Sequence, residues 1–172
     1  MKTVRQAFLA VLCLLGSTAT AAEVSVSEAR LKAGFIANFI QFVSWPQMPT
    51  PLYLCSFGAD RVGELFEHLA DISRRGVQME IRRVKVVTEL KDCHAVYVPA
   101  EQGSMLAAVV DATAGRPVLI ISDLEGGAPL GATLSLVTRA DGRLGFDANL
   151  SVARSAGLAM NSRLLQLARR VY

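Results

Sequence analysis

Short apolar segments alternate with helical segments through the middle of this 172-residue sequence. Residues 52–57, 95–98 and 118–121 are largely apolar and lie between turn-forming residues. Apolar runs of this length between turn signals are typical of strands buried on both faces. Helical segments are predicted at residues 61–69 and 105–110. The alternation predicts an α/β fold, with a single layered domain and a mostly parallel sheet flanked by helices.

An antiparallel hairpin is predicted late in the chain. Residues 132–137 and 144–146 have strand composition, and Asp141-Gly142 between them suits a tight turn with positive φ angles. Residues 77–87 predict one further strand or a pair of strands. Because antiparallel strands are common beside a mostly parallel sheet, we expect the hairpin at an edge of the sheet.

The first helix is predicted at residues 27–44, where apolar residues recur at mostly helical spacing and Ser27 is a plausible cap. Trp45-Pro46 ends this helix, because a residue before proline is pushed toward extended geometry. Phe39, Phe42 and Trp45 raise the question of whether this helix only packs in the core or also contacts a partner.

Two helices are predicted near the C-terminus. Asn149 is expected to cap a helix that Gly157 stops. Asn161 or Ser162 is expected to cap a last helix that runs toward Tyr172. The apolar residues of this last helix occupy more than one of its faces, which indicates either a helix wedged in the core or one that meets a partner. These residues are Leu164, Leu165, Leu167, Ala168 and Val171.

The N-terminus has the order of a secretory signal peptide. Lys2 and Arg5 precede an uncharged run over residues 7–16, and Ala19-Thr20-Ala21 forms a cleavage triplet. A membrane anchor is the alternative, but a span needs about 20 apolar residues. We expect residues 1–21 to be removed, leaving one domain at residues 22–172 in the periplasm, not inserted in the membrane. Cleavage would lower the formal net charge from +3 to +1, which argues against nucleic acid as a partner.

Signal removal would also discard Cys13 and leave Cys55 and Cys93. An even pair of cysteines in an exported protein indicates a disulfide. A metal site formed by both cysteines and His94 is the alternative, although the usual zinc spacings are absent. We predict no cofactor.

The sequence offers little support for catalysis or for ligand binding. The sequence lacks a G-x-S-x-G elbow, but His94 and Ser122-Asp123 could form a hydrolase triad. A periplasmic small-molecule module is the main alternative function, because α/β sheets bind ligands at the carboxyl ends of their strands, where Gly58, Ser122 and Asp123 would lie. The Arg82-Arg83 pair is expected to form part of a solvated sheet face rather than a nucleotide site.

Six sequence blocks, in this order, resemble the YfiR family of periplasmic proteins. They are residues 31–46 (LKAGFIANFIQFVSWP), 54–58 (LCSFG), 93–98 (CHAVYV), 119–123 (LIISD), 145–150 (GFDANL) and 162–168 (SRLLQLA). The resemblance covers residues 27–171. Each block alone has little specificity, but the ordered set with both cysteines is specific.

The resemblance implies a regulator that is not an enzyme. The best-known member represses an inner-membrane diguanylate cyclase by binding its periplasmic sensor domain, which controls cyclic di-GMP signalling and biofilm formation. An outer-membrane, OmpA-like lipoprotein relieves this repression by sequestering the repressor. The resemblance also assigns Cys55 and Cys93 to a disulfide and favours a homodimer. That repressor has a second cysteine pair late in the chain, which this sequence lacks.

We expect the partner to dock on an apolar surface formed by the last helix and the end of the first. The residues predicted to bind it are Phe42, Trp45, Leu164, Leu165 and Arg169.

Overall fold

The structure is a computed structural model that describes residues 19–58, 61–69, 78–139 and 141–172. Nearly all of the predicted signal peptide, residues 1–21, lies outside these ranges. The α-helices are α1 (Ala19–Gln41), α2 (Arg61–Leu69), α3 (Leu106–Thr113), α4 (Leu150–Ser155) and α5 (Ser162–Leu167). Two 3₁₀ helices are η2 (Val87–Asp92) and η3 (Ala100–Met105). No helix among the described residues is both long and apolar enough for a membrane span.

A seven-stranded sheet forms the centre of the domain, in the order β3-β2-β4-β5-β6-β7-β9. Its strands are β2 (Leu52–Phe57), β3 (Met79–Val84), β4 (Ala95–Val98), β5 (Leu119–Ser122), β6 (Leu134–Thr138), β7 (Leu144–Ala148) and β9 (Arg170–Val171). The first five in spatial order are parallel, whereas β7 runs antiparallel to β6 and parallel to β9. The predicted α/β fold with a late hairpin is therefore confirmed, and the short β9 lies outside the hairpin at that edge.

Both faces of the sheet are covered, which explains why the central strands are apolar at nearly every position. In β4, Ala95 and Tyr97 belong to the core cluster on one face, and Val96 and Val98 belong to the cluster on the other. The first cluster includes residues from α1 and α2, and the second includes residues from η2 and α3. Successive side chains of a strand point to opposite faces, so two covered faces require an uninterrupted apolar run.

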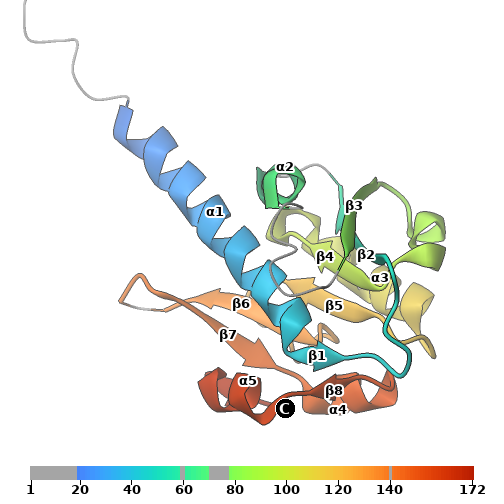
Figure 1. Ribbon diagram of the computed structural model, residues 1–172. Helices are drawn as coiled ribbons and strands as arrows, with labels where there is room; N and C mark the ends of the chain where they lie inside the picture. Colours follow the sequence, from blue (N-terminus) through green and yellow to red (C-terminus); the bar gives the residue numbers. More distant parts are fainter. Residues whose placement is uncertain (1–18, 59–60, 70–77, 140) are drawn as a thin grey trace, which may run out of the picture.

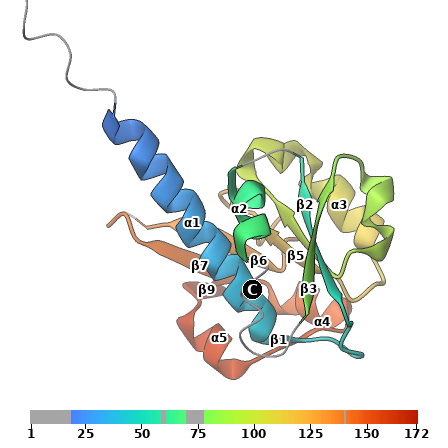
Figure 2. The same ribbon diagram turned by 45° about the horizontal axis from the view of Figure 1, so that its top comes forward.

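The long helix α1 crosses one face of the sheet, and its N-terminal half extends beyond the body of the domain (Figures 1 and 2). The predicted cap at Ser27 is wrong, because α1 begins at Ala19 and continues through that residue. Alanine has the highest helix propensity, and residues 19–22 include three alanines that favour an extension toward the N-terminus. The helix ends at Gln41 rather than at 44, and Val43–Ser44 forms β1.

The two ends of the domain meet in a small antiparallel sheet. Strand β1 pairs with β8 (Ala159–Met160), so that Val43 lies opposite Met160. The prediction of a last helix reaching toward Tyr172 is wrong, because α5 ends at Leu167 and the chain then pairs with β7 as β9. The open outer edge of β7 offers backbone hydrogen bonds that a longer helix could not use.

Asn149 connects the cap of α4 to the interior. Its Oδ1 accepts a hydrogen bond from the N–H of Val152, at 2.9 Å, as predicted for a cap. Its Nδ2 donates to the carbonyl of Ala128, also at 2.9 Å, in a buried contact. Asn161 caps α5 by accepting from the N–H of Arg163 but lies on the surface.

Replacing Asn149 with alanine is expected to lower the free energy of unfolding by about 2 kcal/mol, because the cap and a buried hydrogen bond are both lost. Asn161→Ala is the matched control, with an expected loss of about 1 kcal/mol for the cap alone. Urea unfolding followed by circular dichroism measures both. Equal losses in the two variants would contradict the role of the buried amide.

Candidate functional site

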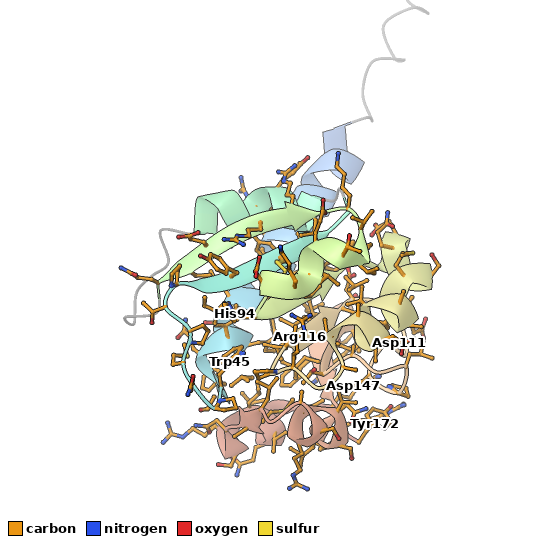
Figure 3. All side chains as sticks on the ribbon, turned by 90° about the vertical axis from the view of Figure 1, so that its right-hand side faces the viewer. Trp45, His94, Asp111, Arg116, Asp147 and Tyr172 are labelled. Atoms are coloured by element: carbon orange, nitrogen blue, oxygen red, sulfur yellow. A yellow bond between two sulfur atoms is a disulfide. The ribbon has the colours of Figure 1, made fainter. Side chains whose placement is uncertain are left out.

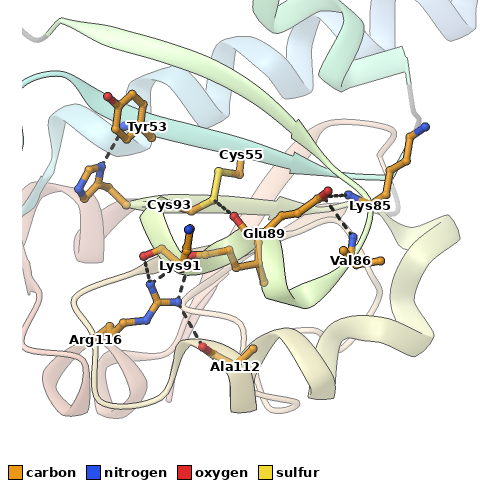
Figure 4. Close-up of a disulfide and its surroundings, with 11 residues drawn as sticks. Tyr53, Cys55, Lys85, Val86, Glu89, Lys91, Cys93, Ala112 and Arg116 are labelled. Atoms are coloured by element: carbon orange, nitrogen blue, oxygen red, sulfur yellow. Dashed lines mark hydrogen bonds between the residues drawn. A yellow bond between two sulfur atoms is a disulfide. The ribbon is translucent and has the colours of Figure 1, made fainter.

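The disulfide joins strand β2 to the segment that leads into its neighbour β4. Cys55 in β2 and Cys93, two residues before β4, are bonded with their Cα atoms 5.9 Å apart. Both residues are buried between the sheet and η2 (Figure 4). The predicted pairing is therefore present, and the bond removes both thiolates from the alternative metal site.

His94 follows the disulfide and is held as a neutral ring. Its Nδ1 accepts a hydrogen bond from the backbone N–H of Tyr53 at 3.0 Å, which leaves the proton on Nε2. The side-chain rings of Tyr53 and His94 are stacked, with centroids 5.5 Å apart. Partial burial lowers the pKa of His94 below its ordinary value of 6.5, and the positive charges of Arg82 and Arg116 lower it further.

The structure does not bring the hypothetical hydrolase triad together. His94 precedes β4, whereas Ser122 ends β5, and the register places Ser122 beside Val98. His94 is four residues before Val98, so it lies about 13 Å from Ser122 along the strand direction. The Ser122 hydroxyl accepts a hydrogen bond from the N–H of Leu124 at 3.0 Å and so closes a turn.

The carboxyl ends of the strands, where a ligand crevice was predicted, are occupied by the chain itself. Asp123 accepts hydrogen bonds from Lys32 of α1 and from the backbone N–H of Ala100, each at 2.7 Å. Gly58 has a φ of +82°, and a Cβ at this position would lie only 3.0 Å from Gln102. These residues fix α1 and η3 against the sheet.

A hollow of about 540 Å³ lies at the opposite end of the sheet. We call it the basic hollow. It is lined by Tyr53, Arg82, Lys91, Asp92, Cys93, His94, Arg116, Pro117 and Val118. Sequence reasoning missed this site because its cations come from three separate segments, none of which carries a binding motif.

The segments that carry the residues predicted to bind a partner are α5 and the chain around β1. Both lie at one end of the molecule, where β1 pairs with β8 (Figure 1). The N–H of Asn161, which precedes α5, donates to the carbonyl of Phe42 at 2.9 Å. Phe42 and Leu165 are half-buried, whereas Trp45 and Leu164 are buried in the core. The two predicted segments, over a hundred residues apart in the sequence, are therefore neighbours in space.

Two of these residues make specific internal contacts. The Trp45 indole donates from Nε1 to the backbone carbonyl of His94 at 3.3 Å (Figure 3). Arg169 forms a bidentate ion pair with the buried carboxylate of Asp147, with distances of 2.8 and 2.7 Å. The pair connects the residue before β9 to β7, so Arg169 has a structural role inside the domain.

Several exposed apolar residues at this end were not singled out from the sequence as binding residues. Leu167 is 67% exposed, and Val171 and Tyr172 are also exposed. Leu167 was among the apolar residues of the predicted last helix, but α5 ends at that residue and leaves its side chain in solvent.

The profile of the YfiR/HmsC-like family matches residues 29–169, which include Phe42, α5 and the disulfide but not Val171 and Tyr172. The chain belongs to the YfiR/HmsC-like family. The family is regulatory and not catalytic, and membership supports a periplasmic regulatory role in general.

Two solved structures resemble this YfiR/HmsC-like domain. An ABC domain from Streptococcus pneumonia, crystallised in complex with L-Trp, matches with a TM-score of 0.55 at 13% identity. A conserved domain protein from Vibrio cholerae O1 biovar eltor matches with a TM-score of 0.51 at 12% identity. Each match covers 84% of this chain but only 60% of the other chain. At this identity the likeness shows the α/β fold alone.

The environment of His94 predicts a pH dependence. Its pKa in the folded domain lies below 6.5, so the unfolded chain takes up the proton first as the pH falls. The free energy of unfolding should therefore be highest above pH 6.5 and decrease below it. An NMR titration of the His94 ring checks the midpoint. His94→Asn, which keeps an acceptor for Tyr53 but does not titrate, should weaken the pH dependence, and an unchanged pH profile would contradict this assignment.

Proposed function

We propose that this protein is a periplasmic regulator that binds the periplasmic sensor domain of an inner-membrane diguanylate cyclase and represses it. The family match over residues 29–169 is the observation that carries this proposal, because it includes the domain from the middle of α1 to the residue before β9. Control of cyclic di-GMP and biofilm formation would follow from that repression. The signal peptide predicted at residues 1–21 would deliver the domain to the compartment that the sensor faces.

The docking surface that we propose lies at the β1–β8 end of the molecule. We define the C-terminal surface as Phe42, Leu165, Leu167, Val171 and Tyr172, which are half-buried or exposed. Trp45 and Leu164 pack beneath it and would support its shape. Exposed apolar side chains grouped at one end of a domain favour a protein partner, since isolated ones need no explanation but clusters mark interaction sites.

Repression requires the regulator to bind the inactive state of the sensor more tightly than the active state. An outer-membrane, OmpA-like lipoprotein that covered the same C-terminal surface would compete with the sensor and relieve repression. We also propose that the protein acts as a homodimer, so that two copies of the surface could engage a dimeric sensor.

Capture from detergent-solubilised membranes tests the docking surface. Wild-type protein should co-purify a membrane protein in which a periplasmic domain is joined to a cyclase domain. Leu167→Asp should lose this capture, because it places a charge in the middle of an apolar contact. Leu130→Asp is the matched control, since Leu130 is 61% exposed in the loop between β5 and β6 and lies outside the C-terminal surface.

The outcomes of this capture are distinct. Loss with Leu167→Asp and retention with Leu130→Asp would support the C-terminal surface. Equal capture by both variants would exclude Leu167 from the interface, and absence of any cyclase with wild-type protein would contradict the proposed partner.

A further inference from the structure

We infer that the basic hollow binds a small organic anion through a carboxylate or phosphate group. The hollow lies at the amino-terminal ends of β2, β4 and β5, away from the strand ends where α/β folds usually bind ligands. Its volume of about 540 Å³ is within the range of small-molecule sites. This inference goes beyond the proposed regulatory function and does not depend on it.

Three cations converge on the hollow from three elements. Arg82 comes from β3, Lys91 from η2, and Arg116 from the turn before β5. Asp92 is the single acidic residue of the lining. Within the described ranges, no carboxylate forms an ion pair with any of the three cations. Like charges gathered in a concave site attract counter-ions of the opposite sign.

The two arginines are held in place by uncharged partners. The Arg116 guanidinium donates to the carbonyls of Leu90, Lys91 and Ala112, at 2.6–3.2 Å (Figure 4). The Arg82 guanidinium lies 3.4 Å from the centroid of the Tyr53 ring. These contacts orient both groups without neutralising them, so a bound anion would meet positive charges that have already lost much of their rotational freedom.

The remaining lining supplies a hydrogen-bond donor and an apolar wall. With Nδ1 of His94 occupied by the Tyr53 N–H, the ring keeps Nε2–H as its donor. Cys93, Pro117 and Val118 provide apolar atoms on the lining. The Cys55–Cys93 bond fixes the segment that carries Lys91 and His94 against β2. The site therefore combines fixed cations with a surface for an apolar ligand body.

NMR titration of the purified protein tests anion binding in the basic hollow. The probes are benzoate, phenyl phosphate and, as an uncharged mimic, benzamide. At least one of the two anions should shift the resonances of His94 and Tyr53 saturably, whereas benzamide should not. The stronger anion identifies the preferred acidic group. The apparent affinity should fall as NaCl is added, because salt screens the cations.

Variants locate the binding. Arg82→Gln and Lys91→Gln should each weaken the anion by roughly tenfold, as expected when a charged hydrogen bond is lost. Arg154→Gln, on α4 and outside the hollow, is the matched control and should leave the affinity unchanged. Arg116 is not substituted, because its guanidinium also holds the backbone of η2. Melting temperatures of all variants confirm that they are folded.

Three results would overturn the inference. The first is no saturable shift with either anion at about 20 mM, a concentration well above the millimolar dissociation constants that a few charged contacts provide. The second is equal binding of benzamide, and the third is unchanged affinity in the Arg82→Gln, Lys91→Gln double variant. The anion titration does not measure binding to a cyclase. A negative titration would therefore leave the proposed regulatory function unaffected.

Discussion

Replacing both Cys55 and Cys93 with alanine is expected to lower the free energy of unfolding by about 4 kcal/mol. The bond closes a loop with a sequence separation of 38 residues. In the chain-entropy account, a crosslink of this length restricts the unfolded chain by about 3.5–4 kcal/mol. Both side chains are also buried, so their truncation adds a smaller packing loss.

Urea unfolding followed by circular dichroism, with and without dithiothreitol, measures this effect. Reductant should destabilise wild-type protein by nearly the same amount as the double substitution, and it should leave the variant unchanged. Two free thiols in the denatured, unreduced protein would contradict the disulfide. A variant as stable as the oxidised wild type would contradict the size of its contribution.

Phe39→Ala is expected to cost about 3–5 kcal/mol, the range for a fully buried phenylalanine. Phe39 is 2% exposed and lies on the face of α1 that packs on the sheet. Its ring contacts Phe35 and Phe146 edge-on, with centroids 6.0 and 4.9 Å apart. Removing the ring leaves a cavity between the long helix and β7 that the surrounding strands cannot close.

Leu31→Ala is the matched control for this substitution. Leu31 lies on the same helix but is 50% exposed, so its truncation should change stability by less than about 0.5 kcal/mol. The same urea unfolding compares the two variants. A loss below about 1 kcal/mol for Phe39→Ala would show that α1 does not anchor on the sheet as described.

Most central elements of the fold could be predicted to within a few residues because their signals are local. Strand β2 and helix α2 have the bounds expected from the sequence, since an apolar run and a helical pattern each define them. The two-residue strands β1, β8 and β9 could not be predicted. They form where distant segments meet, and no property of two residues alone specifies such a pairing.

The candidate sites show the same distinction. The disulfide followed from the number of cysteines and the predicted compartment, and its partners are the expected ones. The pattern of the last helix indicated apolar residues on several faces, but it could not tell that Leu164 is buried while Leu167 is exposed. The basic hollow could not be predicted either, because Arg82 and Arg116 come to line one hollow only through the strand order.

Cyclic di-GMP in living cells tests the central claim most directly. Its concentration is measured in the parent strain, in a deletion strain, and in the deletion strain that carries wild-type protein, Leu167→Asp or Leu130→Asp. We expect deletion to raise cyclic di-GMP, and wild-type protein and Leu130→Asp to lower it again. Leu167→Asp should leave it high although the protein is present in the periplasm. Concentrations that stay the same on deletion would contradict the proposal that this protein represses a diguanylate cyclase.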